Sequence, residues 1–522
     1  MSSLKQTSRD ILKAFVGLVF QHRYAVLVLV LLAQFILYTS DGLWNGDFWE
    51  HSAVVRELMT HPAAPRHPQL TVDATHAFFS PYALLASMVA RLFSLSSIGA
   101  LALLGAVNLL LLTYGLKRFT STIDRTNPSG VSFYTLLLAM FLWGQDAWLF
   151  SGFYNAKIFN SILPYPPTFA LAISFFALSL QVNEGPRLNI LKLLAQLTLS
   201  ALVLLTHPLT AIFLWVSLFA YVGANLSGQV RAWVSLALIT FGSIFLASYW
   251  PYFSILQLML EEGNAYHYAN ANMYQNIIGA TWPILAVAPL IIWKAVASQN
   301  RATCITILIL FVIYAYGFVS EKFAFGRSLS FILLLCNLLL AQAIIDAEDS
   351  LCAKHHLLNL LWRGLVTLLL CVSVGLWMYK SHDRLLTLGN SLFKGRPLSS
   401  ENTYGDLKFL SKYTNQEDLI LADIEASWII PTLSGKVVAT KHPLAFVPDW
   451  FGRKTDVVDF FDINVEATRR LQLLDLYKPQ YLLLRKSDKG TEKIISEQIS
   501  KNRWLSLIIE TDKFILLSLQ PT

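Results

Sequence analysis

Long apolar runs separated by short polar loops fill the first 380 or so residues of the chain. The runs are roughly 17–21 residues long, which is the length an α-helix needs to cross the apolar core of a bilayer. The pattern predicts a polytopic α-helical membrane protein with about eleven transmembrane helices. The predicted spans lie near 24–40, 97–116, 131–144, 167–182, 190–206, 209–226, 233–250, 277–293, 303–319, 328–345 and 363–379.

One further apolar segment, Phe78–Leu95, is predicted to lie in the membrane interface instead of crossing it. Arg91 falls inside the segment, and a Ser-Pro pair precedes its apolar run. This assignment leaves Lys117, Arg118 and Arg125 in a cytoplasmic loop, as the positive-inside rule requires. The N-terminus is then cytoplasmic, and the first loop, 41–96, lies on the outer face of a cell inner or plasma membrane.

From about residue 381 the apolar runs shorten and charged residues become frequent. Short strands alternate with amphipathic helices there, so we expect a C-terminal soluble α/β domain on the outer face. The predicted strands are 418–423, 436–440, 481–486, 504–510 and 514–519, and the predicted helices are 404–413 and 464–477.

Composition supports the assignment as a membrane protein and argues against a soluble, nucleic-acid-binding or disulfide-rich protein. The 522 residues are 55% hydrophobic and 14% charged, whereas soluble proteins are about a quarter charged. The net charge of +7 comes from Lys and Arg between apolar spans, with no aromatic-studded basic stripe, so no nucleic-acid partner is expected. The four cysteines lie in or beside apolar segments, which argues against disulfides and a thiolate zinc site.

The stretch DFWEHSAVVREL, starting at Asp47, follows the first predicted span and has three interpretations. Asp47 and Glu50 have the spacing of a helix cap with a reciprocal partner. Asp47, Glu50 and His51 share one helix face and are candidate ligands for a divalent metal. Asp47 could also be a catalytic base at the edge of the bilayer, because a positioned carboxylate can draw a proton from an acceptor hydroxyl.

Other outer loops carry cations that could neutralise a departing phosphate. The candidate binding residues in these loops are Asp146, Tyr154, Lys157, Lys322 and Arg327. The alternative for Lys322 and Arg327 is that they extend from span ends to lipid headgroups. Neither a Walker A sequence nor a GxGxxG turn is present, so an enzyme here would use a lipid-carried activated group.

This layout resembles that of the GT-C membrane glycosyltransferases, and it does so over nearly the whole chain. In the aminoarabinose and protein-mannosyl branches an acidic pair after the first span precedes an Arg-Glu pair. Asp47 matches the leading acid, Arg56 and Glu57 match the later pair, and Phe48 replaces the second acid. The resemblance implies a GT-C-like transmembrane domain over 1–380 and an extracytoplasmic α/β domain over 381–522.

The resemblance also implies an inverting transfer of a sugar from a polyprenyl-phosphate donor to an envelope lipid, glycan or protein. Asp47 would be the base, with Glu50 or His51 tuning it or holding a cation. His51 and Arg56 are also candidate substrate-binding residues. The competing class is a lipid or polysaccharide transporter or an envelope assembly protein. A glycan polymerase or ligase with a lipid-linked oligosaccharide donor is the second enzymatic alternative.

Overall fold

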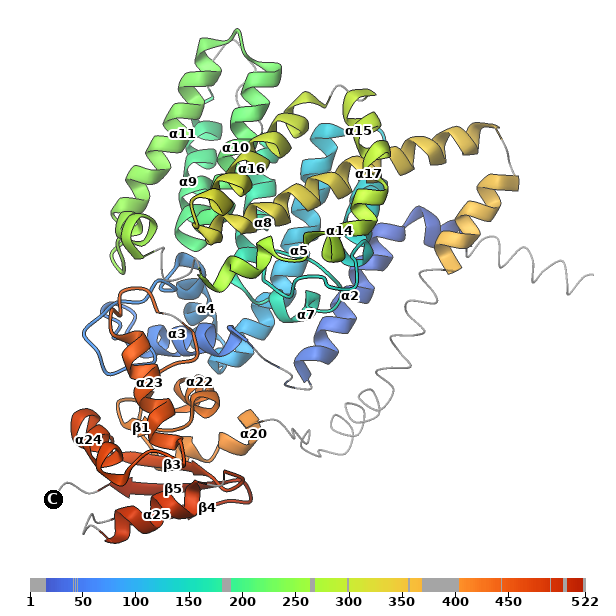
Figure 1. Ribbon diagram of the computed structural model, residues 1–522. Helices are drawn as coiled ribbons and strands as arrows, with labels where there is room; N and C mark the ends of the chain where they lie inside the picture. The colour runs from blue at the N-terminus through green and yellow to red at the C-terminus, as the bar shows by residue number, and fades with distance from the viewer. Residues whose placement is uncertain are drawn as a thin grey trace, which may run out of the picture. The chain divides into compact units, whose positions relative to one another are not determined.

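The computed structural model describes residues 16–40, 42, 44, 46–180, 189–262, 268–297, 300–354, 357–368, 403–442, 444–488, 490–500 and 505–519. The chain divides into two compact units (Figure 1), and each is described by itself. Unit 1 comprises residues 1–41, 103–249 and 267–398. Unit 2 comprises residues 42–102, 250–266 and 399–522.

Unit 1 consists of helices joined by short loops. The labelled α-helices with residues in this unit are α2 (Arg23–Ser40), α5 (Ser97–Ile123), α6 (Pro128–Phe141), α7 (Phe159–Ile162), α8 (Pro166–Ser179), α9 (Ile190–Thr206), α10 (Pro208–Asn225), α11 (Val230–Ser248), α14 (Ile277–Ala286), α15 (Ala288–Ala297), α16 (Arg301–Val319) and α17 (Ser328–Lys354). A further short apolar helix spans Leu357–Leu368. Two 3₁₀ turns, η2 (Tyr268–Tyr274) and η3 (Phe323–Arg327), lie in the connections. Helices α6, α8 and α10 begin at a proline, the position where a missing N–H costs nothing.

Among the described residues, six helical stretches are long and apolar enough to cross a membrane. They are Arg23–Ser40, Ser97–Ile123, Pro208–Asn225, Val230–Ser248, Arg301–Val319 and Phe323–Ser350. Helices α14 and α15 make a seventh if the pair, bent by 55°, is one broken span. The first ten predicted spans are all largely helical, but three of their helices are only 14–17 residues long. The total of eleven spans therefore stays a prediction, and 369–379 of the last one lies outside the described residues.

A buried ion pair joins the first and last long helices of unit 1. Arg23 Nη1 in α2 donates to Glu348 Oε1 in α17 at 3.0 Å, and both side chains are buried. The hydroxyl of Tyr134 donates to the other oxygen of Glu348 at 3.0 Å. Burying two charged side chains costs free energy. The ion pair between Arg23 and Glu348 and the hydrogen bond from Tyr134 offset that cost.

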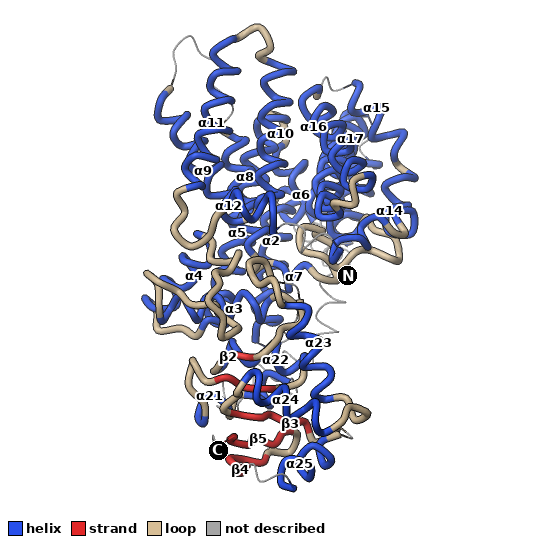
Figure 2. Tube along the Cα trace, turned by 60° about the vertical axis from the view of Figure 1, so that its left-hand side comes forward, coloured by secondary structure: helices blue, strands red, loops and turns tan. Residues whose placement is uncertain are grey.

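Unit 2 contains a five-stranded mixed sheet in the order β2-β1-β3-β5-β4 (Figure 2). The strands are β1 (Leu419–Leu421), β2 (Lys436–Val437), β3 (Tyr481–Arg485), β4 (Leu505–Glu510) and β5 (Phe514–Leu519). Strand β1 pairs parallel with β2 and β3, whereas β5 pairs antiparallel with β3 and β4. Each predicted strand is present, with β1 and β2 shorter than the sequence pattern indicates.

In the described part of the C-terminal segment, six helices accompany the sheet: α20 (Thr403–Leu407), α21 (Leu410–Tyr413), α22 (Ile424–Leu433), α23 (Trp450–Phe461), α24 (Ala467–Tyr477) and α25 (Thr491–Ser500). Phe460 of α23, Leu473 of α24 and Ile494 of α25 share one apolar cluster with Leu482 and Leu484 of β3. The alternation of strand side chains puts Leu482 and Leu484 on one sheet face, and these helices cover that face.

The segment between α2 and α5 folds together with the C-terminal residues in unit 2. It contains α3 (Phe48–Thr60) and α4 (Pro81–Leu92), and the segment 250–266 adds α12 (Ile255–Gln257) and the π-helical turn η1 (Leu258–Glu262). Val437 of β2 donates its N–H to the Gln69 carbonyl at 2.8 Å, so part of the loop extends the sheet. Helix α4 has 12 residues, about 18 Å of helix, which is short for a bilayer core of about 30 Å.

Candidate functional site

Asp47 stands immediately before α3, and its side chain does not cap that helix. Its backbone is already in the helical region, and its carboxylate accepts no capping hydrogen bond. The preceding Gly46 has φ +58°, a left-handed conformation that glycine adopts without a steric penalty. The interpretation of Asp47 and Glu50 as a helix cap is therefore wrong. The Asp47 carboxylate is half exposed and does not serve to cap α3.

The carboxylate of Asp47 faces a histidine from the C-terminal part of unit 2. His442 Nε2 lies 3.6 Å from Asp47 Oδ1, and the two side chains are 43% and 46% exposed. The ring of His442 packs edge-on against the indole of Trp428, with centroids 4.9 Å apart. The same indole donates from Nε1 to the Gly46 carbonyl at 2.8 Å. Trp428 thus connects His442 to the residue that precedes Asp47.

Helices α3 and α22 are joined by two more hydrogen bonds. The hydroxyl of Thr432 donates to the Trp49 carbonyl at 3.0 Å. Arg56 Nη1 donates to the Pro431 carbonyl at 2.9 Å. Arg56, predicted from the sequence as a substrate-binding residue, therefore contributes to holding the two helices together.

Glu50 is buried one turn from Asp47 and pairs with a histidine of the same loop. Its Oε1 lies 3.2 Å from His76 Nε2, and both side chains are buried. Because His76 Nδ1 accepts the N–H of Phe78 at 3.1 Å, a neutral His76 carries its proton on Nε2. That atom lies close to Glu50 Oε1, but the two do not have the geometry of a hydrogen bond. Burial, reinforced by the charge of Asp47, raises the pKa of Glu50 to about 8. Glu50 is therefore protonated at neutral pH, and its contact with His76 shapes the loop.

His51 is also buried, and its ring stacks on that of Phe78 with centroids 4.7 Å apart. Burial lowers the pKa of His51 to about 4, so its imidazole is neutral at physiological pH. The candidate metal triplet thus has one half-exposed member, Asp47, and two buried members, Glu50 and His51. Among the described residues, this triplet does not bring three ligand atoms within 4.8 Å of one another.

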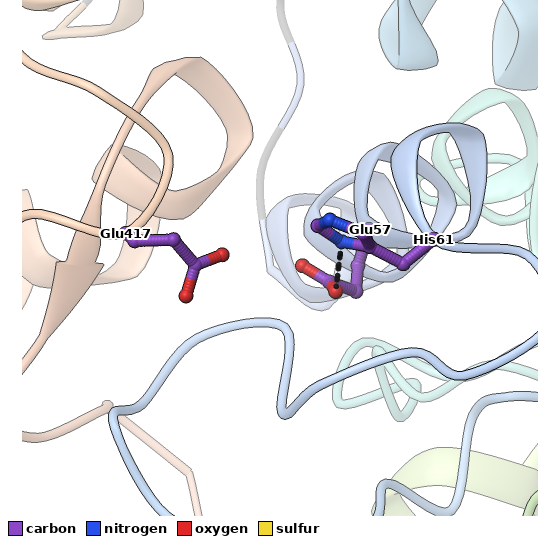
Figure 3. A group of neighbouring side chains, drawn as sticks. All are labelled: Glu57, His61 and Glu417. Carbon is purple, nitrogen blue, oxygen red and sulfur yellow. Dashed lines mark hydrogen bonds and ion pairs between the residues drawn. The ribbon is translucent and has the colours of Figure 1, made fainter.

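A different group of unit 2 side chains does meet that spacing: Glu57, His61 and Glu417 (Figure 3). Figure 3 shows His61 bonded to Glu57, at 2.9 Å between Nδ1 and Oε1, with Glu417 from the segment before β1 opposite them. The sequence alone gives no signal for this group, because Glu417 lies far along the chain from α3.

The carboxylate of Glu57 is already fully used, which makes this group a poor metal site. Its Oε1 also accepts the backbone N–H of Arg66 at 3.0 Å. Its Oε2 accepts from Lys436 Nζ and from Gln416 Nε2, each at 2.9 Å. Four donors occupy the roughly four lone-pair positions of a carboxylate. A cation at Glu57 would have to displace a buried lysine, so the arrangement fits an ion-pair network better than a metal.

In unit 1, Arg327 is the most firmly held of the predicted cations. It ends η3, and its Nε donates to Asn270 Oδ1 at 3.0 Å. Its Nη1 donates to the carbonyl and the hydroxyl of Ser151, both at 3.0 Å. The guanidinium also lies over the ring of Phe150, at 5.8 Å from the centroid. Lys322 precedes the same 3₁₀ turn and is exposed.

The remaining predicted residues occupy the loop between α6 and α7. Exposed Lys157 donates from Nζ to the Gln145 carbonyl at 3.4 Å, and Asp146 accepts from Asn276 Nδ2 at 2.7 Å. Tyr154 is buried, and burial raises the pKa of its hydroxyl. These residues belong to unit 1 with Arg327, whereas Asp47, Glu50, His51 and Arg56 belong to unit 2.

The fold of this chain is similar to that of two solved membrane transferases. The chain is similar to ArnT from Cupriavidus metallidurans bound to undecaprenyl phosphate, with a TM-score of 0.53 and 13% identity over 96% of this chain and 100% of that one. It is also similar to the Archaeoglobus fulgidus oligosaccharyltransferase tethered with an acceptor peptide, with a TM-score of 0.50 and 12% identity over 90% of this chain and 70% of that one. The same enzyme in complex with Zn and sulfate gives a TM-score of 0.51 at 12% identity, over 88% of this chain and 68% of that one.

No protein-family model matches the sequence, and no characterised protein matches it at the level of sequence. The likeness is therefore one of three-dimensional structure. It extends over both units and reaches the whole length of ArnT. The chain shares the fold of ArnT and of the oligosaccharyltransferase, in agreement with the fold that the GT-C resemblance of the sequence predicts.

Proposed function

We propose that this protein transfers a sugar from a polyprenyl-phosphate donor to an envelope lipid, glycan or protein acceptor at the outer face of the membrane. The observation that carries the proposal is the shared fold over 96% of this chain with a protein that binds undecaprenyl phosphate. The half-exposed Asp47 supports it, because its carboxylate serves no capping role at the start of α3.

In the proposed reaction Asp47 accepts the proton of the acceptor hydroxyl. The acceptor oxygen forms a bond to the anomeric carbon of the sugar as the bond from that carbon to the phosphate oxygen breaks. The polyprenyl phosphate leaves with the electron pair of the broken bond. A single displacement of this kind inverts the configuration at the anomeric carbon.

Arg327 is the proposed contact for the donor phosphate. A guanidinium offers a planar fork of donors that matches phosphate oxygens, and the bonds to Asn270 and Ser151 hold it in place. Exposed Lys322 and Lys157 supply further positive charge in the same unit. Glu50, protonated and buried beside His76, is assigned the role of shaping the loop around Asp47.

The test supplies the purified protein in lipid nanodiscs with radiolabelled undecaprenyl-phosphate monosaccharides and, separately, a lipid-linked oligosaccharide. The readouts are release of the polyprenyl phosphate and the configuration of the labelled product. Transfer of the monosaccharides with inversion is expected, and transfer of the oligosaccharide alone would indicate a ligase instead.

Asp47→Asn should lower kcat by at least about 100-fold, while Glu425→Gln, an exposed acid of the same unit that pairs with Lys441, should keep full activity. A folded Asp47→Asn protein with wild-type activity would remove Asp47 from the mechanism. Failure to release polyprenyl phosphate from every donor would overturn the proposal as a whole.

A further inference from the structure

His442 is brought to Asp47 by several contacts that do not depend on their ion pair. The indole of Trp428 packs on the His442 ring and bonds the Gly46 carbonyl. On the other side, the loop carrying His442 is held by Lys454, whose Nζ donates to the Lys441 carbonyl at 3.0 Å. The approach of the imidazole to the carboxylate is thus a consequence of the fold around both residues.

The neighbouring charges leave His442 as the ionisable group directed at Asp47. Lys441, the adjacent cation, points to Glu425, with Nζ 2.7 and 3.0 Å from its two carboxylate oxygens. On the side of α3, the ionisable groups near Asp47 are Glu50 and His51, both buried in neutral form at physiological pH. Asp47 and His442 are both close to half exposed, so a substrate can reach the pair.

A base at the protein surface needs a fixed orientation to work efficiently. A carboxylate at the start of a helix can rotate about its side-chain bonds, and misplacement by about 1 Å can cost up to roughly 100-fold in rate. A donor at one oxygen limits that rotation and leaves the other oxygen for the acceptor hydroxyl. The separation of 3.6 Å between Nε2 and Oδ1 is longer than a hydrogen bond, as is common for catalytic pairs before substrate binds.

We propose that His442 is a positioning residue for the transfer reaction, donating from Nε2 to Oδ1 of Asp47 so that Oδ2 meets the acceptor hydroxyl. The proton of the acceptor then resides on Oδ2, and His442 keeps its own proton throughout. This inference deepens the proposed function and rests on it. It makes the active site a composite of the first outer loop and the C-terminal α/β fold.

The test compares kcat and the KM for donor in wild type, His442→Ala and His442→Gln, with the undecaprenyl-phosphate sugar that the wild type turns over. His442→Ala should lower kcat about tenfold with an unchanged KM, because orientation of the base is lost while donor binding is not. Glutamine carries a side-chain N–H donor, so His442→Gln should retain kcat within about threefold. His61→Gln is the matched control, because His61 is a half-exposed histidine of the same unit that pairs with Glu57 and should leave kcat unchanged.

The possible outcomes separate this inference from the proposed function. Wild-type kcat in His442→Ala, or an equal loss in the alanine and glutamine variants, overturns the positioning role. A raised KM or a lowered melting temperature in both variants identifies a binding or structural role and also overturns it. In each case a large loss in Asp47→Asn keeps the proposed function, whereas full activity in Asp47→Asn removes both.

Discussion

Lys436 and Glu57 form an ion pair in the interior of unit 2. Nζ of Lys436 lies 2.9 Å from Oε2 of Glu57, and the side chains are only 2% and 1% exposed. The same ammonium donates to the His67 carbonyl at 2.8 Å. Burial alone would raise the pKa of Glu57, but Lys436 and the hydrogen bonds around the carboxylate outweigh burial and hold that pKa below its usual value. The pair connects α3, which precedes most of unit 1 in the chain, to strand β2 in the C-terminal segment of unit 2.

Replacing one member of this pair should strongly destabilise unit 2. Lys436→Met leaves the Glu57 carboxylate buried without its cation, which typically costs about 3–5 kcal/mol. Thermal unfolding followed by tryptophan fluorescence should show a clear drop in melting temperature. Lys441→Met, which breaks the exposed pair with Glu425, should cost less than about 1 kcal/mol. Equal effects of the two substitutions would contradict the structural role of the buried pair.

The buried Glu50 should make stability fall as the pH rises from its unfolded pKa to its folded pKa of about 8. Since burial first, and Asp47 second, raise its pKa to about 8, the folded protein holds a proton that the unfolded chain releases near its ordinary value of about 4.3. The contribution of Glu50 to the free energy of unfolding is fully present below the unfolded pKa. It declines as the pH rises from that value to the folded pKa of about 8. Glu50→Gln mimics the protonated acid, so it should abolish a decline on the order of a few kcal/mol.

Melting temperatures at pH 6 and pH 9 check this prediction. Wild type should lose stability over that interval, and Glu50→Gln should lose much less. His76, whose pKa burial lowers to about 3, is neutral in the folded protein over the whole interval, but in the unfolded chain it still releases its proton near pH 6.5. It therefore makes stability rise slightly above pH 6, opposite in sign to Glu50 and equally in wild type and Glu50→Gln. The same decline in both proteins would show that Glu50 is ionised in the fold.

Arg327 should be irreplaceable by lysine if it binds the donor phosphate. Arg327→Lys keeps a positive charge but cannot reproduce the bonds to both Asn270 and Ser151 and still present a planar fork. We expect binding of undecaprenyl phosphate, measured by quenching of tryptophan fluorescence, to weaken about tenfold, the equivalent of about 1.4 kcal/mol. Arg301→Lys, at the exposed start of α16, serves as the control and should bind normally. Wild-type affinity in Arg327→Lys would exclude this residue as the phosphate contact.

The Glu57, His61 and Glu417 group should hold no divalent metal. Because Lys436, Gln416, His61 and Arg66 occupy the Glu57 carboxylate, added Zn²⁺ should leave the melting temperature unchanged. Metal analysis of dialysed protein should find well below one equivalent. Retention of one equivalent, together with a loss of stability on chelation that Glu417→Gln abolishes, would identify a metal site.

Much of the fold was predictable because its elements depend on local pattern. Apolar runs give the helices of unit 1, and β-branched and leucine-rich runs such as FILLSL give the strands of the sheet. Helices α22 and α23 were not predicted. Helix α22 contains Pro431 and is apolar nearly all round, so it has no helical periodicity to recognise.

The site was predictable only where it depends on residues that are close in sequence. Asp47 attracts attention because it follows an apolar span and precedes Arg56 and Glu57 at a familiar spacing. Its partner His442 has no such signal, because the contact depends on how α22 packs against α3. Likewise, nothing in KVVAT shows that Lys436 is buried against an acid of a distant helix.

Unit 2 is assembled from three separate segments of the chain, so the ribosome makes its parts at different times. Residues 42–102 leave the ribosome first, and 399–522 follow only after the helices of unit 1 have been made. At about 5–20 residues per second, roughly 20–80 s separate the synthesis of Asp47 from that of His442. During that interval the nascent chain carries an acidic loop with no partner for it, and a chain terminated early never gains one. Under the proposed mechanism, a new molecule of this protein therefore becomes active only after the segment that carries His442 has been translated and has folded against α3.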